Sequence, residues 1–359
     1  MNEKIKVIDL FCGGGGFSRG LLDAGFDVVA AFDNWDVAVN FYRKNIHGHL
    51  VENMDLLDPQ KVSSRLRQFD CDMIVGGPPC QDFSSAGKRD ENGERANLTI
   101  SFSNIVLTLR PQYFIMENVE RAQATKTFAR AMDIFKTAGY GLTVRVLDAS
   151  LCGVPQKRKR IVVFGIMGKK DDVLATIIQR KQALTPTTIR DYYGDKFGIN
   201  HYYRHPRSYM RRAVFRIDEP SPTVRGVNSP IPKEYPGDPG DTVHVSDAIR
   251  PLTTKERSLI QTFPESWDIS GNKADIEQII GNAVPVKLGE FIGECLREYI
   301  DTVRISEQSE QSAVDTFVYS TPIELEPAQM VLFEKGKRYQ TKPRKPRKTP
   351  QTSQTPQNS

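Results

Sequence analysis

Short apolar runs alternate with helix-like patterns through the first half of the chain. The runs cover residues 5–10, 28–32, 73–75, 113–116, 142–147 and 161–166. This rhythm predicts an α/β sheet with helices on both faces. In such sheets ligands bind beyond the carboxyl ends of the strands, so the residues that follow each run are the first candidates for chemistry.

The second half of the chain is less regular. Residues 169–216 are polar and rich in Tyr and Arg, and prolines and glycines dominate residues 220–241. We expect a smaller domain there. Helical patterns return at residues 253–262 and 286–299, where six apolar side chains share one face. After Arg304 apolar residues become sparse, and the last stretch has the composition of a disordered tail.

Composition indicates an ordinary globular protein. The chain has 359 residues, of which 39% are hydrophobic, and lacks an apolar stretch of membrane-spanning length. The N-terminus has no signal-peptide layout, so we expect a cytoplasmic protein. The cysteines are odd in number, widely spaced and without a CxxC pair, which predicts reduced thiols rather than a zinc or redox motif. They are Cys12, Cys71, Cys80, Cys152 and Cys295.

Charge is unevenly distributed. The whole chain carries +5, but residues 335–359 hold eight Lys or Arg and no acid, so residues 1–334 carry −3. Net charge therefore does not establish a nucleic-acid partner. Local clusters point more directly to one, namely residues 157–160 and the arginines at 204, 207, 211, 212 and 216.

A glycine-rich turn, Asp-Leu-Phe-Cys-Gly-Gly-Gly-Gly-Phe, starts at Asp9 after the first apolar run. Glycines let backbone approach a ligand closely, although a tight turn alone would also explain them. The layout is not GxGxxG, which disfavours a nicotinamide site. Asp33 with Trp35, and Asp55 with Leu56, suit the ribose and base of a nucleoside. Each acid taken singly is equally a helix cap or a loop residue.

Cys80 stands in the segment Gly-Gly-Pro-Pro-Cys-Gln-Asp-Phe-Ser-Ser, after the run that ends at Val75. Two prolines stiffen the backbone directly before the thiol, at the binding edge of the sheet. A structural cysteine normally lies within an apolar pattern, so this position favours a nucleophile. An unreactive turn cysteine is the alternative.

A carboxylate and two arginines follow at other strand ends. Glu117 comes after the run 113–116, so its carboxyl group is expected near Cys80 as an acid. Alternation before residue 161 directs Gln156, Arg158 and Arg160 to one face, and the intervening lysines to the other. An inward arginine beside a carboxylate is informative because buried charge must be paired or used.

Together these segments resemble the cytosine carbon-5 DNA methyltransferase family. DLFCGGGGFSRGL, GGPPCQDFSSAG, ENV, GVPQKRKRI and GNAVPVKLGE occur in the family's order across residues 4–300. The resemblance implies a Rossmann-like S-adenosylmethionine-dependent methyltransferase fold with a smaller target-recognition domain. It also implies S-adenosylmethionine as cofactor, double-stranded DNA as partner, and no metal. The target cytosine would be flipped out of the duplex.

The resemblance assigns domains and roles. Residues 1–168 and 241–302 would form the catalytic domain, residues 169–240 the recognition domain and residues 303–359 the basic tail. Cys80, Glu117, Arg158 and Arg160 would be catalytic. Asp33 or Asn34 would face the ribose, because the family's usual Glu is replaced here by Asn34. The other expected cofactor residues are Asp9, Phe11, Gly13, Gly15, Trp35, Asp55, Leu56, Pro78, Asn282 and Val284.

DNA contacts are expected from two regions. The loop 81–100, with Gln81, Ser84, Ser85 and Arg95, would close over the flipped base, although the family's Arg-Gly pair reads Arg-Ala at 95–96. The recognition region would contribute Arg204, Arg207, Arg211 and Arg212, with Gln156 nearby. Thr223 and Arg225 are expected to organise this domain rather than read bases.

Two other functions fit parts of the pattern. A transfer-RNA cytosine methyltransferase typically continues its cysteine motif with Pro-Phe-Thr, whereas this chain has Asp82-Phe83-Ser84, which favours DNA. A silent DNA-binding module would be expected to lose the thiol or the carboxylate, and both are present. The favoured hypothesis is therefore a monomeric DNA methyltransferase that protects DNA from a partner restriction endonuclease. The sequence does not reveal the bases it recognises.

Overall fold

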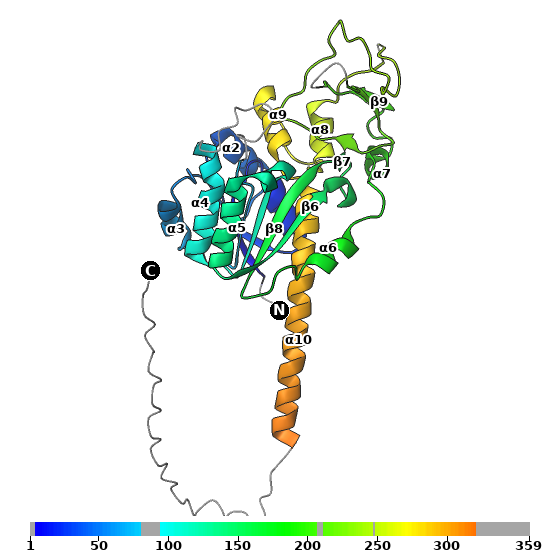
Figure 1. Ribbon diagram of the computed structural model, residues 1–359. Coiled ribbons are helices and arrows are strands. Elements are labelled where there is room, and N and C mark those ends of the chain that lie inside the picture. Colours follow the sequence, from blue (N-terminus) through cyan, green and yellow to red (C-terminus); the bar gives the residue numbers. More distant parts are fainter. Residues whose placement is uncertain (1–3, 80–93, 207–210, 247, 321–359) are drawn as a thin grey trace, which may run out of the picture. The chain divides into compact units, whose positions relative to one another are not determined.

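The computed structural model describes residues 4–79, 94–206, 211–246 and 248–320 (Figure 1). By internal contacts the chain divides into two units, Met1–Val303 and Arg304–Ser359. The first unit contains the sheet and the candidate site. The second contains the end of the last helix.

The strands are β1 (Lys6–Leu10), β2 (Asp27–Asp33), β3 (Leu50–Asn53), β4 (Met73–Gly76), β5 (Tyr113–Val119), β6 (Tyr140–Asp148), β7 (Gln156–Lys157), β8 (Lys159–Met167), β9 (His201–Tyr203), β10 (Val214–Arg216) and β11 (Ser221–Pro222). The helices are α1 (Gly16–Asp23), α2 (Asp36–Asn45), α3 (Pro59–Leu66), α4 (Glu94–Leu109), α5 (Lys126–Thr137), α6 (Ala175–Lys181), α7 (Ile189–Tyr193), α8 (Thr254–Ile260), α9 (Lys273–Asn282) and α10 (Val286–Ser320).

The main sheet has seven strands in the order β3-β2-β1-β4-β5-β8-β6. All neighbouring pairs are parallel except those that involve β8, which runs antiparallel to both β5 and β6. The carboxyl ends of β1, β2, β3, β4 and β5 therefore share one edge. Because β8 is reversed, its first residues lie at that edge too, and Arg160 pairs with Val119 at the end of β5.

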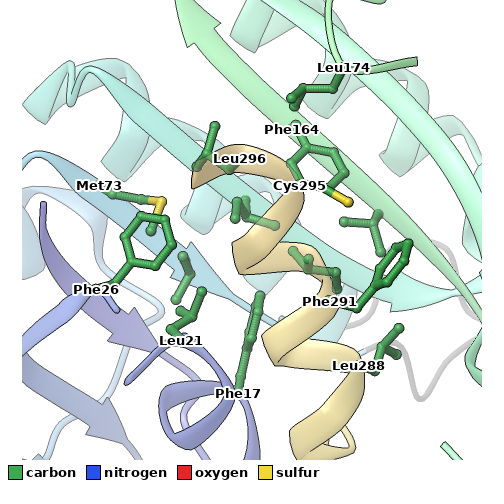
Figure 2. Packing of buried hydrophobic residues seen from close by; sticks show 14 of the residues in the cluster. Phe17, Leu21, Phe26, Met73, Phe164, Leu174, Leu288, Phe291, Cys295 and Leu296 are labelled. Carbon is green, nitrogen blue, oxygen red and sulfur yellow. The ribbon is translucent and has the colours of Figure 1, made fainter. Parts of the chain in front are cut away.

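Both faces of the sheet are covered, which explains why its strands read as nearly continuous apolar runs. On β1, Val7 faces a core with α1, α6 and α10, whereas Ile8 faces a core with α3, α4 and α5. Figure 2 shows the first of these cores, where Leu288, Phe291 and Leu296 of α10 pack against Phe17 and Leu21 of α1.

The region that we expect to recognise DNA, residues 169–240, is joined to the sheet by a third core. Tyr202, Ile217 and Val224 pack in one cluster with side chains of α2, α8 and α9. A small cluster around Tyr203 and Val214 gives the region its own core beside the two-stranded sheet β9–β10. Leu174 and Ile178, just after the expected boundary at residue 169, pack in the main core beside α10.

Three expected elements differ in extent. Residues 94–100 of the anticipated closing loop form the beginning of α4, which starts at Glu94. The last helix continues through Ser320, so residues 303–320 of the expected tail are helical. The rest of that tail, residues 321–359, lies outside the described residues.

Candidate active site

The glycine-rich turn lies between β1 and α1 and takes a conformation that requires its glycines. Phe11, Gly13 and Gly15 have φ values of 60°, 51° and 87°. A Cβ on Gly13 would meet nothing within 4 Å, so the space beside it is open. Such left-handed backbone is sterically costly for a residue with a Cβ, so glycine is favoured at positions 13 and 15 of this turn.

Asp33 braces this turn from the end of β2. Its carboxylate accepts hydrogen bonds from the Gly13 amide at 2.8 Å and the Trp35 amide at 2.9 Å. Burial raises the pKa of Asp33, and these amide bonds oppose that rise. Asn34 beside it is exposed, and Trp35 is half-buried. Asp33 is thus largely engaged within the protein, whereas the Asn34 side chain faces solvent.

The remaining expected cofactor residues lie at the same edge. A Cβ on Gly16 would fall 2.1 Å from the carbonyl oxygen of Val284, so the turn packs directly against the segment after α9. Asn282 is exposed at the end of α9. Asp33 pairs with Asn53 of β3, which places Asp55 two residues beyond that pairing. Asp55 is exposed and Leu56 is buried.

Glu117 is buried near the end of β5 and lies beside the segment that leads to Cys80. Its Oε2 would be 3.3 Å from a Cβ on Gly77, and the neighbouring Asn118 donates to the carbonyl of Pro78 at 3.1 Å. Arg160 Nε lies 2.9 Å from Glu117 Oε1, with side chains only 13% and 9% exposed. Burial lowers the pKa of Arg160, and Glu117 counteracts this.

Several expected site residues lie outside the described residues. They are Cys80, Gln81, Ser84, Ser85 and Arg207. Arg95 lies in the first turn of α4, but its side chain is not described. The structure therefore describes the carboxylate, the two arginines of residues 158–160 and the segment before the thiol. Pro79 is the last described residue of that segment.

Arg158 is placed differently from Arg160. It is 2% exposed, and its guanidinium donates to the carbonyls of Val224 at 3.2 Å, Gly281 at 3.1 Å and Ala283 at 3.0 Å. Burial lowers its pKa well below the usual range, and Arg160 adds to this. Arg160 thus pairs with Glu117. Arg158, which was also expected to be catalytic, joins the segment at Val224 to the end of α9.

Gln156 is buried completely rather than presented to DNA. Its amide nitrogen donates to Gln261 Oε1 at 2.6 Å, and its oxygen accepts from the Val224 amide at 2.9 Å. A side chain engaged at both ends inside the protein has no surface for a duplex. Gln261 was not anticipated, because nothing local in the sequence signals a partner 105 residues away.

The arginines of the recognition region have distinct surroundings. Arg204 donates to the carbonyl of Thr223 at 2.8 Å. Arg212 pairs with Glu219 at 2.9 Å and lies over the ring of Phe215, 4.3 Å from its centroid. Arg211 is exposed. Of these three, Arg211 has the most accessible side chain for a phosphate, while Arg212 is engaged within the region.

Comparison with known proteins decides the family. The model of the C-5 cytosine-specific DNA methylase family matches residues 5–298. The chain belongs to this family. Type II methyltransferase M.HgiDI of Herpetosiphon aurantiacus is 50% identical to this methylase over 305 residues, which are 85% of this chain and 98% of that protein. M.HindV of Haemophilus influenzae is 49% identical over 293 residues, 81% and 96% of the two chains.

Solved structures share the fold of this methylase. S. pombe Dnmt2 methyltransferase superposes with a TM-score of 0.62 at 19% identity, covering 83% of this chain and 99% of that one. A putative DNA modification methyltransferase of an E. coli prophage gives 0.58 at 20% identity, covering 83% and 100%. The Rossmann-like α/β fold is thereby confirmed.

No helix in the described part of the methylase is long and apolar enough to cross a bilayer.

Proposed function

We propose that this methylase transfers a methyl group from S-adenosylmethionine to carbon 5 of a cytosine turned out of a specific double-stranded sequence, with Cys80 as nucleophile. The family supports the transfer to cytosine in DNA rather than transfer RNA. The Type II names of its relatives support a role in protecting DNA beside a restriction endonuclease.

One observation carries the proposal: the buried pair of Glu117 and Arg160 faces the backbone that leads to Cys80. The pair is 2.9 Å apart, and Gly77, close to Glu117, is three residues from the thiol. A carboxylate kept from water and held by one guanidinium is suited to exchange a proton with a base beside it. This arrangement matches the chemistry that cytosine requires.

Carbon 5 of cytosine is a weak nucleophile until a thiolate adds to carbon 6. We assign this addition to the Cys80 thiolate. Glu117, which Arg160 holds in position, would share a proton with ring nitrogen 3. S-adenosylmethionine supplies the electrophilic methyl group. A base or a water molecule then takes the carbon-5 proton, the electron pair of that C–H bond forms the double bond between carbons 5 and 6, and Cys80 leaves as a thiolate. Arg158 acts by holding backbone around this site.

The edge of the sheet fits the proposed cofactor. Open space beside Gly13, the half-buried indole of Trp35 and the exposed side chains of Asn34 and Asp55 form a cradle for a nucleoside. Asp33 already binds two backbone amides, so we assign it to the turn and the ribose contact to Asn34. Turning the base out of the duplex costs a few kcal/mol, which contacts from the expected recognition region and residues 81–93 would offset.

The function is tested by methyl transfer to unmodified duplex DNA and to transfer RNA, followed by bisulfite sequencing of a plasmid from an expressing host. We expect transfer to DNA, and methylated cytosines in a single short sequence. Transfer to RNA alone would overturn the proposal.

Covalency is tested with duplex that carries 5-fluorocytosine at the target. Fluorine cannot leave as a proton does, so the wild-type protein should form a complex that survives denaturation. Cys80→Ala should form none, while Cys71→Ala, which alters another free thiol, should trap normally. A trapped adduct with Cys80→Ala would show that another residue is the nucleophile.

Glu117→Gln should lower kcat by about 10²–10⁴-fold, because it removes the proton donor while preserving shape. Cofactor affinity should stay within a few-fold. Glu120→Gln is the matched control, since that partly exposed acid lies 3.8 Å from Lys159. If cofactor affinity falls as much as kcat for Glu117→Gln, the assigned role is incorrect.

A further inference from the structure

A buried ion pair lies outside the candidate catalytic residues. Arg257 of α8 and Glu277 of α9 approach to 2.8 Å, with side chains 8% and 4% exposed. Burial lowers the pKa of Arg257, which Glu277 opposes. Removing two charges from water is costly unless both make further hydrogen bonds. The other hydrogen-bond partners of this pair therefore indicate its structural role.

Three of those partners belong to one segment, residues 225–228. Arg257 donates to the carbonyl of Val227 at 3.2 Å and to that of Arg225. Glu277 Oε1 accepts from Asn228 at 3.4 Å, and also from Thr254 at 2.7 Å. The planar guanidinium thereby fixes the backbone of a segment that has no regular secondary structure of its own.

Arg225, Val227 and Asn228 line a hollow that is open to solvent. Tyr202, Arg204 and His205 line the same hollow. None of the described residues that line it is an Asp or Glu. The lining instead carries the donor groups of Arg204, Arg225 and Asn228. A hollow rich in donors and without carboxylates suits a ligand group that carries acceptors.

The hollow also lies close to the candidate active site. Val224, which lines it, is held by Arg158, two residues before the Arg160 that pairs with Glu117. A duplex with its cytosine in that site would present neighbouring groups here. The acceptor-bearing groups of DNA are phosphate oxygens and base edges, above all guanine O6 and N7.

We propose that Arg257 and Glu277 are positioning residues for sequence discrimination: they fix residues 225–228 so that the hollow receives an acceptor-bearing group of the target duplex. This inference rests on the proposed function and deepens it. The pair touches neither the cofactor cradle nor Glu117, so it affects which duplex is methylated rather than the methyl-transfer step.

The test replaces both charges at once. Arg257→Met with Glu277→Leu keeps volume and leaves no unpaired charge, yet cannot hold the segment. The ratio of kcat/KM between the preferred duplex and duplexes with one altered base pair should fall by about tenfold, the low end of single-pair discrimination. S-adenosylmethionine affinity and kcat on the preferred duplex should stay within a few-fold. The control is Lys196→Met with Glu265→Leu, an exposed pair 2.6 Å apart.

Arg257→Lys provides a second variant, which keeps the charge and loses the planar fork. Its discrimination should lie between those of the wild type and the double variant. The inference is overturned if both variants discriminate between duplexes as well as the wild type does. If the double variant does not fold, wild-type discrimination by Arg257→Lys is enough to overturn it. A wild-type protein that methylates no duplex would instead overturn the proposed function on which the inference rests.

Modified duplexes identify the group received. Substituting 7-deazaguanine removes the N7 acceptor of one guanine, and a methylphosphonate removes the charge of one phosphate. At least one such substitution should weaken wild-type methylation about tenfold and affect the double variant much less. If every substitution affects both proteins equally, the hollow receives no such group and the inference fails.

Discussion

Asp9 is a carboxyl group buried beneath the glycine-rich turn. It is 1% exposed, and the Ser18 hydroxyl donates to its Oδ2 at 2.5 Å. Burial raises its pKa from 3.8 to about 7, the Ser18 bond opposes this, and nearby Asp33 adds to it. The residue type was recognised in the sequence as part of the turn, but its burial and its partner depend on the packed fold.

This pKa predicts how stability depends on pH. Between about pH 4 and 7 the unfolded chain has lost the Asp9 proton while the native protein retains it. The free energy of unfolding should therefore fall as pH rises through that window and level off above it, by up to about 4 kcal/mol. Urea unfolding at pH 5 and pH 8 measures the change.

Asp9→Asn, which is neutral throughout, should remove most of that pH dependence. Asp70→Asn is the control, because Asp70 is 86% exposed and should change stability by less than about 0.5 kcal/mol. An unchanged pH profile in Asp9→Asn would mean that other groups determine it.

At the level of elements, the strands of the main sheet were predictable because both faces are covered and the runs are apolar. The edge strand β3 was not, since only Val51 of its four residues is buried. Helix α9 was also missed, and the reversal of β8 has no local signal. Alternation did predict the inward side of residues 156–160, because Gln156 and Arg158 are buried while Lys157 and Lys159 are exposed.

The candidate site was predictable where strand ends converge and not where distant backbone supplies the partner. Glu117 and Arg160 meet because both stand at one sheet edge. The carbonyls that Arg158 binds are 66 to 125 residues away, and no side-chain pattern marks them. Arg257 and Glu277 likewise pair across two helices whose packing is set by the whole fold.

Close packing of α9 against residues 225–226 yields a prediction. A Cβ on Gly281 would lie 2.1 Å from the Gly226 amide nitrogen, so Gly281→Ala must push these backbones apart. We expect a loss of about 1–3 kcal/mol of stability and weaker cofactor binding, because Asn282 and Val284 follow directly. Thermal unfolding and calorimetric titration with S-adenosylmethionine measure the two effects.

Gly289→Ala is the matched control in α10. There a Cβ would be 3.2 Å from the nearest atom, in the Phe17 side chain, which can adjust. It should change stability and cofactor affinity little. Similar behaviour of the two variants would show that the contact with Gly226 is not limiting.

At the level of the whole molecule, charge is concentrated in the last 25 residues. Residues 335–359 carry eight basic side chains, more than the net +5 of the chain. We propose that this segment adds sequence-independent phosphate contacts. The logarithm of DNA affinity falls with that of salt by about 0.9 per phosphate neutralised.

Deleting residues 335–359 should therefore reduce the slope of log DNA affinity against log salt, by less than the slope expected for eight phosphate contacts. The methylated sequence should stay the same. Filter binding from 50 to 200 mM salt and bisulfite sequencing measure the two properties. Equal salt slopes would indicate a segment that only aids solubility. A changed target would place part of the recognition beyond the assigned region.

Besides the apolar cluster around Tyr202, the expected recognition region is held to the rest of the protein by hydrogen bonds to its backbone. Arg158 binds three carbonyls, Gln156 binds the Val224 amide, and Arg257 binds two more carbonyls. Main-chain atoms are common to all amino acids, so these hydrogen bonds place little demand on side-chain identity outside that apolar cluster. Other residues of the region can therefore change towards new target sequences while its attachment to the sheet is kept. A region exchanged between relatives that keep these contacts should pack on the sheet in the same way.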